Sequence, residues 1–298
     1  MKIAYIIITH RHAAQLSRLI QRLDKPGVSF VLHISTNCEP GFYEQVHAAY
    51  ADAPNVFFTP RIPVYWGDFS IVKASLNAID TLVKHGIDYD YAIMISGQDY
   101  PLQSHQVICD TLAAGNGHQF MEYVDHDDME PDTRHRLYSN HLWIKDKHWW
   151  YPHYGRPTLK IKVFDGILSL FLPCERTIPN GYRGYKGSFW WYLTRDCIEY
   201  IHAFVRSDAG KRLVRFFRFG YHSAEYFYQT LLLNSAYRDQ IINTDHRYAI
   251  WYEDSGHPKT LGVEDFEALR GSGKLFGRKF DLARNAEIFD LLDTAAGE

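Results

Sequence analysis

The chain has 298 residues, of which 46% are hydrophobic and 22% charged, proportions that exclude a disordered protein, a collagen-like repeat and a pure coiled coil. Its formal net charge of −3 provides no general basic field for a phosphate backbone, so we expect no nucleic-acid partner. The four cysteines are widely separated and form no CxxC pair, which indicates neither a zinc knuckle nor a disulfide framework.

No segment of the sequence is apolar over the roughly 20 residues that a membrane span requires. The first ten residues, MKIAYIIITH, contain too short an apolar run for a secretory signal and predict a buried strand instead. The apolar stretch 163–173, VFDGILSLFLP, contains Asp165 and is also short, although it could touch a membrane surface. We therefore expect a cytoplasmic protein without a membrane span, and peripheral contact with the inner membrane stays open.

The first 124 residues alternate predicted strands with predicted helices, the pattern of a mostly parallel α/β sheet. Apolar runs predict strands over 3–8, 28–34, 56–59, 91–95 and 119–124, and helical spacing predicts helices over 16–23, 42–51, 71–83 and 107–114. The run YAIMI at 91–95 is apolar throughout, as in a strand buried on both faces, and it ends in the turn SGQDYP. Ligands of such sheets bind beyond the carboxyl ends of the strands.

The rest of the chain divides into an irregular middle and a regular end. Residues 125–186 are polar, aromatic and interrupted by Pro and Gly, so we interpret them as insertions over the site and predict no elements there. A strand over 188–193 and helices over 196–205 and 223–235 follow. We expect residues 1–298 to form one domain from the three parts 1–124, 125–186 and 187–298.

Two carboxylates stand where chemistry is expected. Asp99 follows the strand at 91–95, where it could contact a ligand or form an Asx turn before the proline. Glu225 lies in the first turn of the helix at 223–235, with Ser223 as the predicted N-cap. The helix dipole favours a carboxylate there whether or not it catalyses, and the functional alternative for Glu225 is a general base.

Local charges offer two further hypotheses. Cations set among apolar and aromatic residues near the C-terminus could gather a diphosphate, or form an ordinary solvated surface; they are Arg247, Lys274, Arg278 and Lys279. Asp125 and Asp127 follow the strand at 119–124 and offer hard oxygen ligands to a divalent ion, although two Asp residues at this spacing are common by chance. The motifs GxSxG, GxGxxG and HExxH are absent, which removes the usual hydrolase, dinucleotide and zinc signatures.

Five motifs occur in a familiar order along the chain. They are Tyr65-Trp66-Gly67 with Ser70, then YDYAIMISGQDYPL, GSFWWYLT, SAEYFYQTLL and LFGRKFD. Together they resemble the core-2/I-branching β-1,6-N-acetylglucosaminyltransferase and peptide O-xylosyltransferase family, in a short, bacterial-type form. The resemblance implies a GT-A-like (Rossmann-like) fold and inverting transfer from a UDP-sugar, with no metal or other cofactor required because basic side chains take the place of the cation.

The resemblance also implies roles for individual residues on the donor side. Glu225 matches the catalytic base, and the Arg and Lys that hold the diphosphate match Arg247 and Lys279. Trp66 and Ile8 match positions near the uridine, and the turn residue Asp99 is assigned to the donor as well. Many branching enzymes have His-Val-Asp at the end of the second strand, where this chain has His33-Ile34-Ser35, so Ser35 takes the place of a carboxylate.

On the acceptor side the resemblance is looser. Glu122 matches a carboxylate near the acceptor or donor sugar, Arg134 or Arg136 matches a nearby basic residue, and Trp190 of GSFWWYLT is assigned to the same side. By this interpretation residues 1–124 bind the nucleotide-sugar, 125–186 face the acceptor, and 187–298 supply catalysis and diphosphate binding.

The function expected from the resemblance is transfer of GlcNAc or xylose from a UDP-sugar to a hydroxyl of a glycan or glycolipid, in surface polysaccharide or glycoconjugate synthesis. Two alternatives stay open. One is a glycoside hydrolase that uses Glu225 and Glu122 around one glycosidic bond. The other is a non-catalytic glycan-binding domain that uses the aromatic stretch 143–154.

Overall fold

The computed structural model describes residues 1–144, 147–153, 158–252 and 256–297. A seven-stranded sheet of order β10-β6-β9-β4-β1-β2-β3 forms its centre. The strands are β1 (Ile3–Thr9), β2 (Val28–Ile34), β3 (Val56–Phe58), β4 (Tyr91–Ser96), β6 (Gln119–Val124), β9 (Lys186–Thr194) and β10 (Ile241–Ile242). Within this sheet β9 runs antiparallel to its neighbours and the other strands are parallel, which confirms the α/β class with a mostly parallel central sheet.

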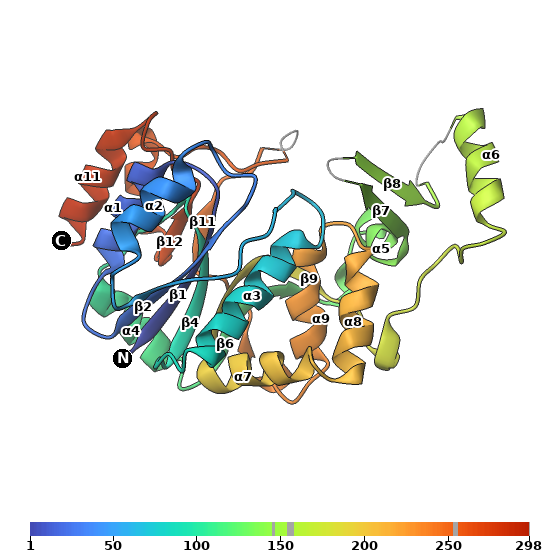
Figure 1. Ribbon diagram of the computed structural model, residues 1–298, viewed down its shortest axis with the longest axis horizontal. Helices are drawn as coiled ribbons and strands as arrows, with labels where there is room; N and C mark the ends of the chain where they lie inside the picture. Colours follow the sequence, from blue (N-terminus) through green and yellow to red (C-terminus); the bar gives the residue numbers. More distant parts are fainter. Residues whose placement is uncertain (145–146, 154–157, 253–255, 298) are drawn as a thin grey trace.

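Helices cover both faces of the sheet (Figure 1). One hydrophobic core includes residues of α3 (Ser70–Lys84), α7 (Arg195–Phe204), α8 (Asp208–Arg218) and α9 (Phe227–Leu233). The other includes residues of α1 (Ala13–Leu23), α2 (Phe42–Tyr50), α4 (His105–Ala114), α10 (Phe266–Gly271) and α11 (Ala286–Ala295). Every residue of β1 is buried, with Ala4 and Ile6 in the first core and Ile3 and Tyr5 in the second, because side chains alternate along a strand.

The elements predicted for the first 124 residues all form, with small shifts at their ends. They form because β1, β2 and β4 are continuous apolar runs that bury both faces, as parallel strands between two helix layers do. Their parallel order β4-β1-β2-β3, with helices on both sides, is the Rossmann-like arrangement expected of a GT-A-like fold.

A second, three-stranded sheet joins segments that are distant in sequence. Its order is β11 (Arg247–Ala249), β12 (Phe276–Arg278) and β5 (Asp99–Pro101). The antiparallel pair β12 and β5 places Arg278 directly opposite Asp99. The parallel pair β11 and β12 brings Arg247 to the same small sheet. These three-residue strands are too short to show a periodic pattern, so they were not predicted.

The middle of the chain is more regular than its composition indicates. It contains α5 (Pro131–Tyr138), the hairpin of β7 (Asn140–Ile144) and β8 (Lys147–Tyr151), and α6 (Leu159–Leu168). In Figure 1 this part lies at one end of the molecule, and α6 stands away from the central sheet. No helix in the described ranges has the length and apolar character needed to cross a membrane.

Glycine at position 187 is required by the close approach of β6 and β9. A Cβ atom at Gly187 would lie 1.9 Å from the carbonyl oxygen of Glu122, whereas a Cβ at Gly166 on α6 would meet nothing within 4 Å. We therefore expect Gly187→Ala to lower the free energy of unfolding by about 1–3 kcal/mol. Urea unfolding measures this loss. The matched control, Gly166→Ala, should cause none, and equal effects of the two substitutions would contradict the prediction.

Candidate active site

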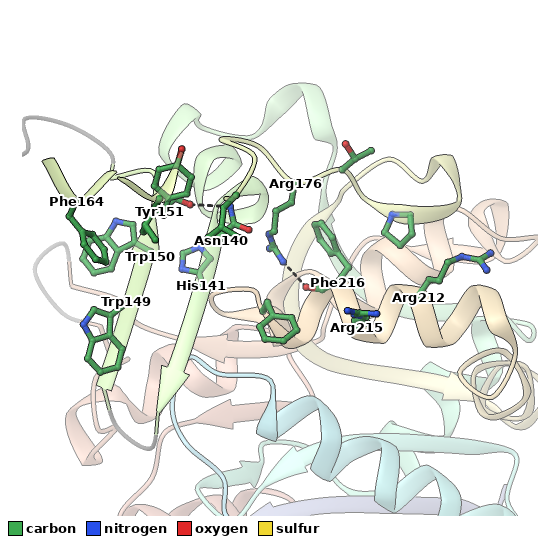
Figure 2. A pocket seen from close by; sticks show the side chains of 15 residues that line it. Asn140, His141, Trp149, Trp150, Tyr151, Phe164, Arg176, Arg212, Arg215 and Phe216 are labelled. Carbon is green, nitrogen blue, oxygen red and sulfur yellow. Dashed lines mark hydrogen bonds between the residues drawn. The ribbon is translucent and has the colours of Figure 1, made fainter. Parts of the chain in front are cut away.

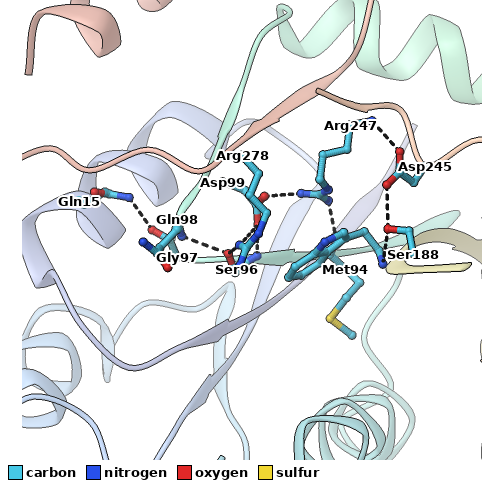
Figure 3. Close-up of polar contacts among 11 residues, drawn as sticks. Gln15, Met94, Ser96, Gly97, Gln98, Asp99, Ser188, Asp245, Arg247 and Arg278 are labelled. Carbon is cyan, nitrogen blue, oxygen red and sulfur yellow. Dashed lines mark hydrogen bonds and ion pairs between the residues drawn. The ribbon is translucent and has the colours of Figure 1, made fainter. Parts of the chain in front are cut away.

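A buried carboxylate organises the carboxyl edge of the central strands. Asp99 is fully buried, accepts a hydrogen bond from the backbone N–H of Ser96, and forms an ion pair with Arg247. The second arginine, Arg278, lies 3.6 Å from the other carboxylate oxygen (Figure 3). Asp99 therefore has no free surface for a ligand, and its contacts make it a residue that positions the two arginines.

One tryptophan ring supports both of these arginines. The guanidinium carbons of Arg247 and Arg278 lie 4.5 Å and 4.8 Å from the centre of the Trp190 ring. Trp190 was assigned to the acceptor side from the sequence, whereas the structure places it beneath the arginines. Such contacts orient guanidinium groups while leaving their charge available.

Further hydrogen bonds fix the backbone of the same network. Arg247 donates from its side chain to the carbonyl oxygen of Met94, at 3.3 Å, and from its backbone N–H to Asp245. The hydroxyl of Ser188 donates to the second oxygen of Asp245, at 2.8 Å. Figure 3 shows this chain of contacts running from the end of β4 to β9 and β11.

Several cations lie close together at this edge, and their charges exceed those of the carboxylates nearby. Burial lowers the pKa of Lys279, and the neighbouring charges of Arg278 and Arg11 lower it further. Within the described ranges neither Lys279 nor Arg11 forms an ion pair. Like charges held this close in a folded protein are stabilised by a bound anion, so this edge has the electrostatics of an anion site.

Trp66 lies between this cationic edge and the candidate base. It is 59% exposed, an unusual degree for so large an apolar side chain. Its ring centre is 4.4 Å from that of His222 and 5.8 Å from that of His257. His257 faces the cations, since Lys279 and Arg278 contribute to its lowered pKa after burial. A flat, exposed ring in this place offers a stacking surface for a nucleobase or a sugar.

Glu225 lies on the other side of Trp66. Its carboxylate is 3.6 Å from Nδ1 of His222 and 3.8 Å from Nζ of Lys186. Burial raises the pKa of Glu225, and the charges of Lys186 and Arg136 oppose that shift. The side chain of Glu225 is 39% exposed, so a hydroxyl group can approach it from solvent.

The prediction that Ser223 is the N-cap of the helix containing Glu225 is wrong. Residues Ser223–Glu225 form a 3-10 turn that precedes α9. His222 occupies its N-cap position in a left-handed conformation and makes no side-chain capping hydrogen bond. Ser223 instead donates its hydroxyl hydrogen bond to the carbonyl oxygen of Phe217, at 2.6 Å, at the end of α8. Because α8 was not predicted, the partner that competes for this hydroxyl was not visible in the sequence.

Burial raises the pKa of Glu225 and that of a second carboxylate, Glu122, and the positive charge of Lys186 lowers both. Burial and the charge of Asp245 raise the pKa of Glu122, while Lys274 and Lys186 lower it. Glu122 therefore belongs to the same region, as the sequence motif suggested, and Lys186 acts on both carboxylates. Neither Lys186 nor Arg11 was predicted, although Arg11 lies two residues after the end of β1, at the strand edge where ligands are expected.

The remaining predicted residues serve mainly in local structure. Ile8 is almost fully buried at the end of β1. Ser35 is 1% exposed, and its hydroxyl accepts a hydrogen bond from the backbone N–H of Val64, at 2.9 Å. Arg134 donates to the carbonyl oxygen of His126, whereas Arg136 acts on Glu225.

The two aspartates considered as metal ligands contact an arginine instead. Arg183 forms an ion pair with Asp127 and lies 3.9 Å from Asp125. The hydrogen bond from Arg183 lowers the pKa of Asp127. Across the part of the chain that the structure describes, no group of three or more His, Cys, Asp or Glu side chains could hold a metal ion.

Comparison with known proteins identifies the family. The family model for the Core-2/I-branching enzyme matches residues 3–270. The chain belongs to the Core-2/I-branching enzyme family. This membership confirms the resemblance drawn from the five motifs.

Named relatives of this family member include xylosyltransferases. Xylosyltransferase 2 of Rattus norvegicus is 25% identical over 320 aligned residues, and xylosyltransferase 1 of Homo sapiens is 23% identical. Both alignments cover 98% of this chain, but only 33% and 30% of the respective relatives. The chain thus spans about a third of their length.

Among solved structures, a UDP-glucose pyrophosphorylase mutant from Leishmania major is 10% identical, with a TM-score of 0.33. That match covers 70% of this chain and 52% of the other. No functional resemblance follows at this level of similarity.

The raised pKa of Glu225 predicts how the stability of the protein depends on pH. Folding favours the protonated carboxyl, so ionised Glu225 lowers the stability of the wild-type protein as the pH rises through its folded pKa. We expect Glu225→Gln to raise the melting temperature at neutral pH and to lose this advantage below about pH 4.3, the ordinary pKa of Glu.

Thermal unfolding across this pH range measures the difference between the two proteins. The matched control is Glu267→Gln on α10, which changes an exposed carboxylate and should leave the pH profile unchanged. A Glu225→Gln protein that melts below the wild type at neutral pH would contradict the prediction.

Proposed function

We propose that this family member is an inverting glycosyltransferase that moves a sugar from a UDP-sugar to a hydroxyl of a glycan. The observation that carries the proposal is the placement of an exposed ring, Trp66, between an accessible carboxylate of raised pKa and a crowded cationic edge. A nucleotide-sugar needs these three parts, namely a surface for the base, charge for the diphosphate and a group that activates the acceptor.

The cationic edge would bind the donor diphosphate. Lys279 and Arg11 supply charge that has no carboxylate partner among the described residues, and Arg278 adjoins them. Arg247 is buried and paired with Asp99, so it would support the edge from behind without contacting the diphosphate. These groups would stabilise the charge that grows on UDP as it leaves, which is the work that a metal ion performs in other enzymes. We therefore propose that the transfer needs no metal.

Glu225 would act as the general base. It accepts the proton of the acceptor hydroxyl while that oxygen forms a bond to the anomeric carbon of the sugar. The bond between that carbon and the diphosphate oxygen breaks, UDP takes the electron pair, and the configuration inverts because attack and departure occur on opposite faces. The raised pKa of Glu225 strengthens its affinity for the proton.

Burial raises the pKa of Glu225, and two nearby cations lower it. Lys186 lies 3.8 Å from the Glu225 carboxylate, and Arg136 contributes a second positive charge. Both favour the ionised form that a base must have before it can accept a proton. They oppose the effect of burial, which alone would raise the pKa of Glu225 further.

The donor sugar is proposed from the relatives. Their names specify xylosyl transfer, and the resemblance of the five motifs to N-acetylglucosaminyltransferases adds GlcNAc, so xylose and GlcNAc are the two sugars to test first.

Replacing the proposed base should slow turnover strongly without affecting donor binding. Glu225→Gln keeps the size of the side chain but loses the proton acceptor, so we expect kcat to fall about 10²–10⁴-fold. Release of UDP and formation of the glycan product, followed for the UDP-sugar that binds, measure this loss. Glu267→Gln is the matched control. A hydrolase would instead release sugar from a glycoside with no UDP-sugar present, and near-normal transfer by Glu225→Gln would disprove the assignment.

Replacing a cation at the edge should affect donor binding. We expect Lys279→Met to weaken binding of UDP and UDP-sugars about tenfold or more, because it removes a charge-assisted hydrogen bond. Thermal shifts with UDP-xylose, UDP-GlcNAc and UDP, each with EDTA and with Mn²⁺, measure the binding. Lys73→Met, on the exposed face of α3, is the control. Donor binding that requires Mn²⁺ would contradict metal independence and would favour Asp125 and Asp127 as metal ligands.

A further inference from the structure

Helix α6 exposes an apolar surface that nothing in the described chain covers. None of the ten residues of Leu159–Leu168 is buried. Leu159, Val163 and Ile167 repeat at a spacing of four residues, so they form a stripe along one side of the helix. Leu170 and Phe171 in the turn that follows are each 77% exposed. This is a large apolar surface for a protein in water.

Specific contacts hold α6 in place despite its exposure. The carboxylate of Asp165 accepts a hydrogen bond from the backbone N–H of His153, at 3.1 Å, and contacts Nδ1 of the same residue, at 2.8 Å. Asp165 is the one acidic residue in α6, and this pairing turns it toward the body of the protein. The exposed stripe is therefore left without a carboxylate.

A cavity of about 820 Å³ lies behind the helix. Phe164, Leu168 and Leu172 repeat at a spacing of four residues and line it, so α6 is apolar on its inner side as well. Figure 2 shows the labelled Trp149, Trp150 and Phe164 gathered at one end of the cavity, and Arg212 and Arg215 toward the other. The cavity thus combines an aromatic, apolar part with a basic part.

Positive charge surrounds the apolar surface. Segments 158–176 and 208–218 together contain seven Lys and Arg residues against three Asp and Glu residues, in a chain whose net charge is −3. Within the described ranges, Lys211 is the one of these seven cations that forms an ion pair, with Asp208. Lys160, Lys162, Arg215 and Arg218 form neither an ion pair nor a side-chain hydrogen bond among the described residues. An apolar surface bordered by unpaired cations is complementary to lipid chains with anionic headgroups.

We propose that α6 and its following turn dock on the surface of an anionic lipid bilayer. The outer stripe enters the boundary between headgroups and hydrocarbon, the basic residues contact the headgroups, and the cavity receives a hydrocarbon chain. The helix lies on the bilayer, because its ten residues are about half the length of a span. A second copy of the chain fits less well, since pairing through α6 would bring the unpaired lysines of the two copies together.

The docking surface adjoins the candidate active site. His141 lines the cavity and stacks on Tyr221, with ring centres 5.6 Å apart. Tyr221 in turn stacks on His222, at 4.0 Å, and His222 contacts Glu225. If the proposed function holds, on which this one consequence rests, the docked protein presents Glu225 to acceptors carried by the membrane. The docking itself does not depend on that function.

Flotation of the full chain with lipid vesicles tests the docking. We expect binding to vesicles of phosphatidylcholine with phosphatidylglycerol, and much weaker binding to phosphatidylcholine alone or at high salt. Leu170→Asp should lower the partition coefficient about tenfold, because it removes an apolar side chain from the bilayer. Arg215→Gln should lower it about fivefold on anionic vesicles.

Matched controls lie far from α6. Val107→Asp on α4 makes a similar apolar-to-acidic change at an exposed position, and Lys73→Gln on α3 removes an exposed cation. Both should bind vesicles like the wild type. A wild-type chain that stays in the soluble fraction would overturn the proposal, as would equal losses in Leu170→Asp and Val107→Asp.

Two further measurements separate the alternatives. A concentration-dependent dimer that Leu170→Asp dissociates, without vesicle binding, would identify a second copy as the occupant and reject the bilayer. Sugar transfer to a water-soluble acceptor should be unchanged in Leu170→Asp. Vesicle binding by a chain that transfers no sugar would support the docking and reject the proposed function, so the two failures are distinguishable.

Discussion

The ion pairs of Asp99 are the interaction on which the donor side of the site depends. A fully buried carboxylate between two arginines is costly to desolvate, and breaking such a group leaves an uncompensated charge in the interior. The arrangement therefore fixes the relative positions of β5, β11 and β12, which supply Asp99, Arg247 and Arg278. Lys279 is the next residue along the chain from Arg278, so its place at the edge follows from the same pairing.

The two halves of the site use burial in opposite ways. Burial lowers the pKa of Lys279 and raises that of Glu225, so each group is less stable in its charged form than it would be in water. A bound diphosphate would relieve the first penalty, and the acceptor proton would relieve the second. The free protein thus contains unfavourable charge interactions that its proposed substrates would remove. Such interactions lower the stability of the free protein and favour binding and catalysis.

The extent to which the sequence predicts the structure follows from the length of each pattern. The strands β1, β2 and β4 are long apolar runs, and they were predicted almost to the residue. Family motifs brought Glu225, Arg247, Lys279 and Trp66 into one hypothesis, and the structure places them around one edge. The role of Asp99 as a buried partner was not predictable, because strands of three residues carry no periodicity. Lys186 was missed because its importance lies in its distance to Glu225, which sequence spacing does not encode.

The three-stranded sheet also shows that residues beyond the family match are needed to complete the cationic edge. The family match ends at residue 270, whereas β12 and Lys279 lie beyond it. The C-terminal helix α11 contributes as well, since Asp293 accepts a hydrogen bond from Tyr100 of β5, at 2.8 Å, and pairs with Arg18. A fragment cut at the family boundary would leave Asp99 with a single arginine and β5 without an antiparallel partner. The limit of the family match is therefore too short here to keep the cationic edge intact.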